Sequence, residues 1–284
     1  MRQYILKLSC IALAILSISC TKDDPVAENL MEFSFDHPGA TKVTDTNFEQ
    51  NDKVGIYIAT AGNTLEGAGN YITNNKLTYD GTKWNPEHQM FWNTGRYDVY
   101  AYYPYVASVP SVSDMPLSVS QEQNIVQNYM ESDFLWASKT DIMASNSPVN
   151  MTFSHKMSRI YMTLVPGEDY SGEIPEDAQV FVHNVITEAT VDLNVGIVTI
   201  NDRADSKTLQ ARNMGNNRYS AIIVPQRISS RIPLIEVVMD GVSYLYETSF
   251  NFKRGIQHNV SLVISKNPAQ IKIEIGGEID NWDE

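Results

Sequence analysis

Apolar and polar residues alternate along most of the chain in short segments, which is the pattern of half-buried β-strands. Residues 31–36 and 53–59 are clear examples. Asp80-Gly81 and Asp240-Gly241 each separate two such segments, and Asp-Gly is a pair that type I′ hairpin turns accept. No amphipathic segment of helical period is longer than about ten residues. The pattern therefore predicts an all-β chain of short strands.

The longest predicted strand covers residues 151–165. Its apolar residues occupy odd positions in the first half and even positions in the second half. A β-bulge near Ser158 would produce this change, because one extra residue turns the following side chains to the other face. The segment 168–177 is rich in Gly, Pro and acidic residues and is predicted to be a linker. We therefore expect two β-sandwich domains in tandem, over 31–167 and 168–284.

Residues 1–19 have a different pattern, with basic residues followed by a mostly apolar run over 8–19. That run is shorter than the roughly 20 residues that cross a bilayer, and it fits the central region of a secretory signal peptide. Ser19-Cys20 resembles a bacterial lipobox, in which the cysteine is lipidated and becomes the mature N-terminus. Residues 20–30 then form a tether. The alternative is an ordinary cleaved signal with an incidental cysteine.

The composition narrows the function. The chain carries 21 Lys plus Arg against 34 Asp plus Glu, a formal net charge of −13. A surface this acidic repels nucleic acid and anionic membranes. Both cysteines, Cys10 and Cys20, lie in the leader or at its end. The folded part therefore has no cysteine for a disulfide or for thiolate chemistry, and its stability must come from a hydrophobic core.

Motifs for catalysis and metal binding are missing from the sequence. The histidines are far apart, at His37, His88, His155, His183 and His258. None has the spacing of a zinc site, and no nucleophile elbow, Walker loop or dinucleotide-binding loop is present. His155 is on the apolar face of its strand, where a core histidine bonded to backbone is the simplest interpretation. We expect no metal, no cofactor and no enzymatic activity.

The tyrosine-rich run Tyr97–Tyr105 has two interpretations. Aromatic faces stack on sugars, so Tyr100 and Tyr102 on one face of a strand would suit a carbohydrate platform. Tyrosine is also a favoured strand residue that packs in cores and interfaces while its hydroxyl finds a partner. A monomeric glycan-binding surface lipoprotein that uses this run is therefore the alternative function for the chain.

Several longer motifs resemble one family. They are the leader with its acidic tail Thr21–Asp24, then Ala40–Phe48, Asp52–Tyr57, Tyr97–Tyr105, Asp133–Ala137 and Phe153–Ile160. Together they resemble the fimbrillin-like (Mfa-like) proteins, the type V pilins of Bacteroidales, whose lipoprotein precursors reach the cell surface. The resemblance implies two transthyretin-like β-sandwiches, which agrees with the strand pattern.

The resemblance also implies a removable strand. Such pilins are exported as lipoproteins with an N-terminal strand in a groove of the first domain. A trypsin-like protease cuts after a basic residue in the next loop, and the C-terminal strand of a neighbouring subunit fills the groove. Here the implied displaced strand carries Met31, Phe33 and Phe35. The implied cut lies between Lys42 and Val43, where the family usually has Arg.

The C-terminal segment is suited to be the donated strand. Ile271, Ile273 and Ile275 alternate with charged residues, Gly276-Gly277 would form a hinge, and Ile279 would be a further anchor. Main-chain bonds would supply affinity while the alternate side chains fill pockets. The alternative is that this segment is simply the last strand of its own domain.

The preferred function is thus a fimbrial subunit or an accessory or anchor pilin at the outer membrane and cell surface. Its expected partners are other pilin subunits, the outer membrane through a lipid on Cys20, and a surface receptor, with no nucleic acid. The sequence leaves stalk, tip and anchor roles open.

Overall fold

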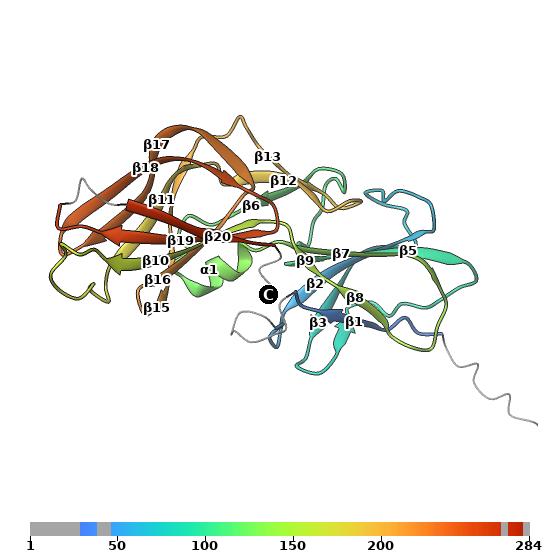
Figure 1. The fold of residues 1–284 in the computed structure, drawn as a ribbon. Coiled ribbons are helices and arrows are strands. Elements are labelled where there is room, and N and C mark those ends of the chain that lie inside the picture. Colours follow the sequence, from blue (N-terminus) through green and yellow to red (C-terminus); the bar gives the residue numbers. More distant parts are fainter. Residues whose placement is uncertain (1–28, 39–46, 268–271, 281–284) are drawn as a thin grey trace, which may run out of the picture.

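The computed structural model describes residues 29–38, 47–267 and 272–280. These ranges contain twenty strands and one helix, α1 (Val126–Glu131). The all-β class predicted from the alternation is confirmed. No helix in the described part is long and apolar enough to cross a membrane. Figure 1 shows that the strands gather into two groups, with β1 in one group and β20 in the other.

The first group is built on a six-stranded sheet. Its strands, in spatial order, are β4 (Trp84–Pro86), β3 (Ile72–Tyr79), β2 (Lys53–Thr60), β5 (Arg96–Tyr103), β7 (Leu135–Met143) and β9 (Ser154–His155). The predicted β3–β4 hairpin is present, but its loop covers the four residues 80–83, because Tyr79 pairs with Trp84 and the Asp80 N–H donates to the Lys83 carbonyl. The two-residue type I′ turn expected at Asp80-Gly81 is therefore wrong. Gly81 has a φ of 98°, and Asp80 Oδ1 accepts the backbone N–H groups of Thr82 and Lys83. A two-stranded parallel sheet, β1 (Phe33–Asp36) with β8 (Val149–Thr152), completes the group.

Both faces of the six-stranded sheet are covered. Strand β2 shows this most clearly, because every residue between its two ends is buried. Val54, Ile56 and Ile58 share one face, as the alternation predicted. That face belongs to the N-cluster, whose buried members are Met31, Phe33, Phe35, Val54, Ile56, Ile58, Leu77, Trp84, Met90, Trp92, Tyr97, Val99, Ala101, Leu135, Ala137, Val149, Met151 and Phe153.

The second group contains three sheets. The five-stranded sheet has the order β15 (Arg212–Gly215), β16 (Arg218–Ile223), β10 (Ser158–Pro166), β19 (Ile256–Ile264) and β20 (Lys272–Asp280). The four-stranded sheet has the order β14 (Lys207–Gln210), β11 (Gln179–Val185), β17 (Gln226–Met239) and β18 (Val242–Phe252). The three-stranded sheet has the order β13 (Ile197–Ile200), β12 (Glu188–Asp192) and β6 (Met115–Ser118).

These sheets enclose the C-cluster, formed by buried side chains of α1, β6, β10–β14 and β16–β19 with Tyr57, Ala59, Leu65 and Tyr102 from the first group. Strands β6 and β10, which come before the predicted linker at 168–177, pair with strands that come after it. The structure defines two hydrophobic clusters and does not define a boundary between domains. The division into domains at residue 167 therefore stays a prediction.

The predicted long strand at 151–165 is in fact three strands, β8, β9 and β10. Met151 and Phe153 belong to the N-cluster, whereas Met157 and Ile160 belong to the C-cluster. The change of parity near Ser158 therefore marks the crossing of the chain from one group of sheets to the other. The expected bulge is wrong. A chain that passes from one hydrophobic cluster to another shows the same shift of apolar positions as a strand whose side chains switch from one face of a sheet to the other.

Candidate functional site

The predicted displaced strand is integrated into the N-cluster. Met31, Phe33 and Phe35 are 2%, 6% and 8% exposed. In β1, Phe33 lies opposite Val149 and Phe35 lies opposite Met151 on the parallel neighbour β8. All three side chains therefore face inward, as the alternation of residues 31–36 predicted.

The backbone of this segment is bonded to two different parts of the chain. The N–H groups of Val149 and Phe153 donate to the carbonyls of Glu32 (2.8 Å) and Asp36 (3.0 Å). Before β1, the Met31 N–H donates to the Met90 carbonyl at 2.9 Å. Residues 31–36 thus lie between β8 and the segment around Met90, bonded as an inserted strand would be.

Aromatic rings form the walls around Phe35. Its ring centroid lies 5.1 Å from that of Trp84 in an edge-to-face contact and 5.3 Å from that of Phe153. The Phe33 ring stacks on Phe35 at 6.3 Å. Contacts of this kind contribute roughly 0.5–1.5 kcal/mol each beyond the burial of area. The site is therefore lined by aromatic rings as well as by aliphatic side chains.

A concavity runs beside β1. Its volume is about 450 Å³, and it lies between residues 31–35 and the segment 82–86, which contains the edge strand β4. Trp84, Tyr79 and Pro148 also line it. The strand therefore does not fill the whole space between β8 and the edge of the six-stranded sheet.

The predicted lipidation residue Cys20 and the predicted cleavage residues Lys42 and Val43 lie outside the described residues. The segments on either side of 39–46 meet each other, because the ring centroids of His37 and Phe48 are 5.0 Å apart. Phe48 also lies edge-to-face with Trp84 at 5.0 Å and packs against Phe153 at 5.6 Å. Sequence reasoning assigned no role to Phe48. Its only signal was its place at the end of the Ala40–Phe48 motif.

The predicted donor segment pairs with its own chain. Strand β20 is the edge strand of the five-stranded sheet and runs antiparallel to β19, with Ile273 opposite Leu262 and Ile275 opposite Val260. Gly276 falls at a register shift. Ile279 lies opposite Gln257, and Ile271 lies outside the described residues. This pairing is the arrangement that the sequence left open as the alternative.

The tyrosine run does not form an exposed platform. Tyr97 and Tyr102 are 4% and 1% exposed. The Tyr102 ring lies so close to Gly55 that a side chain there would collide with it. The Tyr102 hydroxyl donates to Asn74 Oδ1 at 2.7 Å, and burial raises the pKa of this tyrosine. Tyr102 is a buried member of the C-cluster and Tyr100 packs against it, so the packing interpretation of these tyrosines holds and the sugar-stacking alternative does not.

His155 and His183 take part in bonds that hold the structure together. His155 Nδ1 lies 2.7 Å from Asp133 Oδ2 in the interior, so this core histidine pairs with a carboxylate as well as being buried. His183 bonds Thr208 Oγ1 at 2.9 Å and Glu236 Oε2 at 2.8 Å across the four-stranded sheet. Ser243 donates to the same carboxylate, and these two bonds lower the pKa of Glu236, with the serine making the larger contribution. Among the described residues, no three metal-ligating side chains of the His, Cys, Asp and Glu types come together.

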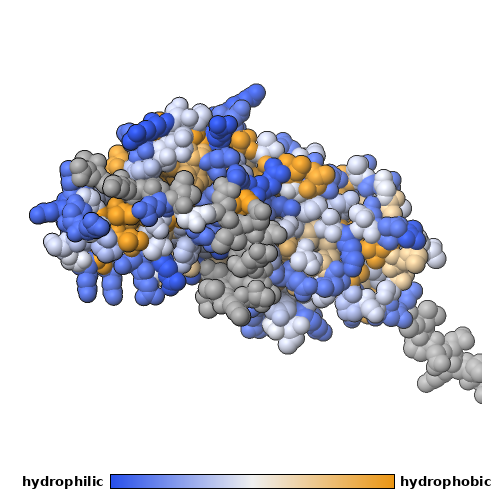
Figure 2. Space-filling model, in the orientation of Figure 1, coloured by the Kyte–Doolittle hydropathy of each residue, from blue (hydrophilic) through white to orange (hydrophobic). Residues whose placement is uncertain are grey.

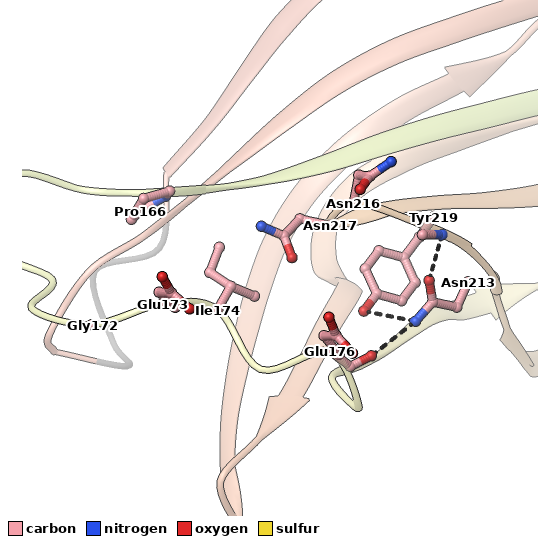
Figure 3. Close-up of a pocket in the computed structure, with 10 residues that line it drawn as sticks. Pro166, Gly172, Glu173, Ile174, Glu176, Asn213, Asn216, Asn217 and Tyr219 are labelled. Carbon is pink, nitrogen blue, oxygen red and sulfur yellow. Dashed lines mark hydrogen bonds between the residues drawn. The ribbon is translucent and has the colours of Figure 1, made fainter.

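A second concavity, of about 770 Å³, lies beside the β15–β16 hairpin (Figure 3). Asn213 Nδ2 donates to the Glu176 carbonyl at 3.1 Å and to the Tyr219 hydroxyl at 3.4 Å. These groups thus bond to one another within the wall. Figure 2 shows that the viewed face of the molecule is largely hydrophilic, with hydrophobic residues in small separate groups. The β1 groove remains the best-defined candidate site.

Comparison with known proteins identifies the class. The model of the fimbrillin-like family matches residues 41–282, most of the chain. The chain therefore belongs to the fimbrillin-like family. Membership makes it a pilus-related subunit of the cell-surface fimbrium, one that assembles with other pilin subunits. No curated protein sequence matches it.

Solved structures share the fold at low sequence identity. A candidate cell adhesion protein from Bacteroides uniformis has a TM-score of 0.68 at 19% identity, covering 88% of this chain and 97% of that one. Another from Bacteroides ovatus has a TM-score of 0.70 at 17% identity, with 90% and 98% covered. A fimbrial protein from Bacteroides vulgatus has a TM-score of 0.55 at 12% identity, with 88% and 99% covered. These likenesses extend over nearly the whole chain.

Proposed function

We propose that the chain is a structural pilus subunit that is exported as a lipoprotein on Cys20, cut between Lys42 and Val43, and assembled by strand exchange. The observation that carries the proposal is the integration of β1 into the N-cluster while, among the described strands, it pairs with β8 alone. Cutting the chain after Lys42 would turn this strand into a separable peptide. Its groove would then accept a strand from another subunit by β-augmentation.

The C-terminal strand is the proposed donor. Within the described part of the chain, strand β20 has one neighbouring strand, β19, so its detachment breaks a single ladder of backbone bonds. Gly277 has a φ of 131°, a conformation that favours glycine, next to the register shift at Gly276. Its alternate residues Ile273 and Ile275 would enter the vacated groove of the next subunit. The paired strand would be the resting position of the donor before assembly.

The glycan-binding alternative loses its support, since the platform proposed for it contains the buried Tyr102. The family and the site also favour a structural subunit over an enzyme. Attachment to the outer membrane through the lipid and contact with a surface receptor are further parts of the proposal.

The test is the N-terminal sequence and intact mass of the protein in fimbriae and in membranes. The expected result is a chain beginning at Val43 in fimbriae and an acylated Cys20 in the precursor. Lys42→Ala should accumulate the precursor and abolish polymer, whereas the nearby Lys53→Ala should do neither. A polymer made of chains that retain β1 would contradict strand exchange. Retention of the lipid in every chain, with one copy at the base of each fibre, would indicate an anchor.

A further inference from the structure

The groove occupied by β1 is shaped around two phenylalanine rings. Phe33 and Phe35 are both more than nine-tenths buried. Phe35 contacts the ring of Trp84 on one side and that of Phe153 on another. Phe48 packs against both Trp84 and Phe153, which fixes the two walls relative to each other. A rigid wall of rings cannot close around a smaller side chain without losing these contacts.

The groove has unfilled space even with both phenylalanines in place. The concavity of about 450 Å³ beside β1 is lined by both rings, by Trp84 and by Tyr79. A strand with smaller side chains at the same two positions would enlarge this space. The wall atoms would then lose their dispersion contacts.

The chain's own C-terminal strand carries smaller groups. Its alternate positions are Ile271, Ile273 and Ile275, followed by Gly277 and Ile279. An isoleucine side chain has three fewer carbon atoms than a phenylalanine side chain and has no ring edge to place against Trp84. Register cannot correct this, because Trp282 is the one aromatic residue among residues 271–284, so no register places two aromatic side chains at alternate positions.

We propose that the groove selects a donated strand with aromatic side chains at two alternate positions, so that the preferred donor is a different subunit and not a second copy of this chain. The inference rests on the strand exchange proposed above. The chain would thus accept a heterologous aromatic strand and offer an aliphatic strand to a groove of another shape. It would occupy a junction between unlike subunits and would not form a homopolymer.

The first experiment measures the preference of the groove within the intact chain. The double variant Phe33→Ile with Phe35→Ile should lower the urea midpoint of unfolding. The matched control, Phe91→Ile, makes the same change at a residue that is 42% exposed and should leave the midpoint nearly unchanged. If the double variant is as stable as the control, the groove has no aromatic preference and the inference is overturned.

The second experiment measures the donor in exchange. A site-specific protease sequence inserted after Lys42 allows the full chain to be cut while the β1 fragment remains bound. Two synthetic peptides then compete with the fragment: residues 270–284 as they stand, and the same peptide with Ile273→Phe and Ile275→Phe. Release of the fragment is followed by size exclusion and mass spectrometry. The aromatic peptide should act at a concentration at least about tenfold lower.

The outcomes separate the two proposals. Equal or better displacement by the natural peptide would overturn the selectivity and leave strand exchange intact. Failure of both peptides to displace the fragment would overturn strand exchange, and the selectivity with it. Displacement by the aromatic peptide alone supports both. This second experiment decides the question even if the double variant does not fold.

Discussion

The two terminal strands of the described chain are held in opposite ways. Strand β1 and Met31 just before it place three large side chains in the N-cluster; β1 is bonded to β8, and Met31 is bonded to Met90. Strand β20 lies at the edge of its sheet and has β19 as its one neighbour. The first strand is part of a core that would be incomplete without it. The second is attached along one side and can leave at the cost of one ladder. An acceptor needs the first property and a donor needs the second.

Truncation should give the largest difference between the two strands. A chain that starts at Val43 loses the burial of Met31, Phe33 and Phe35, about 5–9 kcal/mol at roughly 1.5–3 kcal/mol per side chain. That is comparable with the whole free energy of unfolding of a domain. A chain that ends at Asn267 should keep a cooperative transition. Urea unfolding followed by the fluorescence of the N-cluster tryptophans checks this. Equal loss from both truncations would refute the contrast.

A single side chain should reproduce part of the effect. Phe35→Ala removes a ring enclosed by Trp84 and Phe153 and should lower the free energy of unfolding by about 3–5 kcal/mol. The control Phe91→Ala, at an exposed position, should cost about 0.5 kcal/mol. Chemical denaturation of both variants is the measurement. A small effect at Phe35 would show that the groove collapses easily around a smaller group.

A backbone change should loosen β20 alone. Gly277→Ala introduces a side chain at a φ of 131° and should cost about 1–3 kcal/mol locally. Hydrogen exchange of the amides in β19 and β20 should become faster, while the amides of β1 and β8 should keep their protection. Gly276→Ala, at a residue without positive φ, is the control and should have the smaller effect. Faster exchange in β1 as well would mean that the two ends are coupled.

Acid should have the smallest effect, at the hairpin next to the groove. Backbone bonding from Lys83, followed by bonds from Thr82 and Asn85, lowers the pKa of Asp80 from its usual 3.8. A lowered folded-state pKa gives stability that is full above pH 4 and is lost as the pH falls further. The urea midpoint should therefore be steady from pH 5 to about pH 4 and fall below it, and Asp80→Asn should reduce that fall. An unchanged pH profile in the variant would exclude Asp80 as its source.

Much of the local structure could be predicted from the sequence. The alternation over residues 53–59 identified the buried face of β2, and Asp80-Gly81 identified the β3–β4 hairpin. The inward residues of β1 could also be read from the pattern. The sequence was ambiguous where one local pattern fits two tertiary arrangements. The parity change near Ser158 fits a bulge, which was predicted, or a crossing between cores, which the structure has. The tyrosine run fits an exposed face or a covered one, and the sequence left both open.

The sequence by itself determined which side chains turn inward, because the period of a strand is a local property. The tertiary structure alone decided which strands become neighbours. Ser34 and Asn150 share a hydrogen bond although they are 116 residues apart, and no local pattern encodes that contact. The aromatic walls of the groove likewise come from β4, the segment before β9 and Phe48, which meet only in the fold. Pairing over such distances is decided by the competition of all strands for the same core.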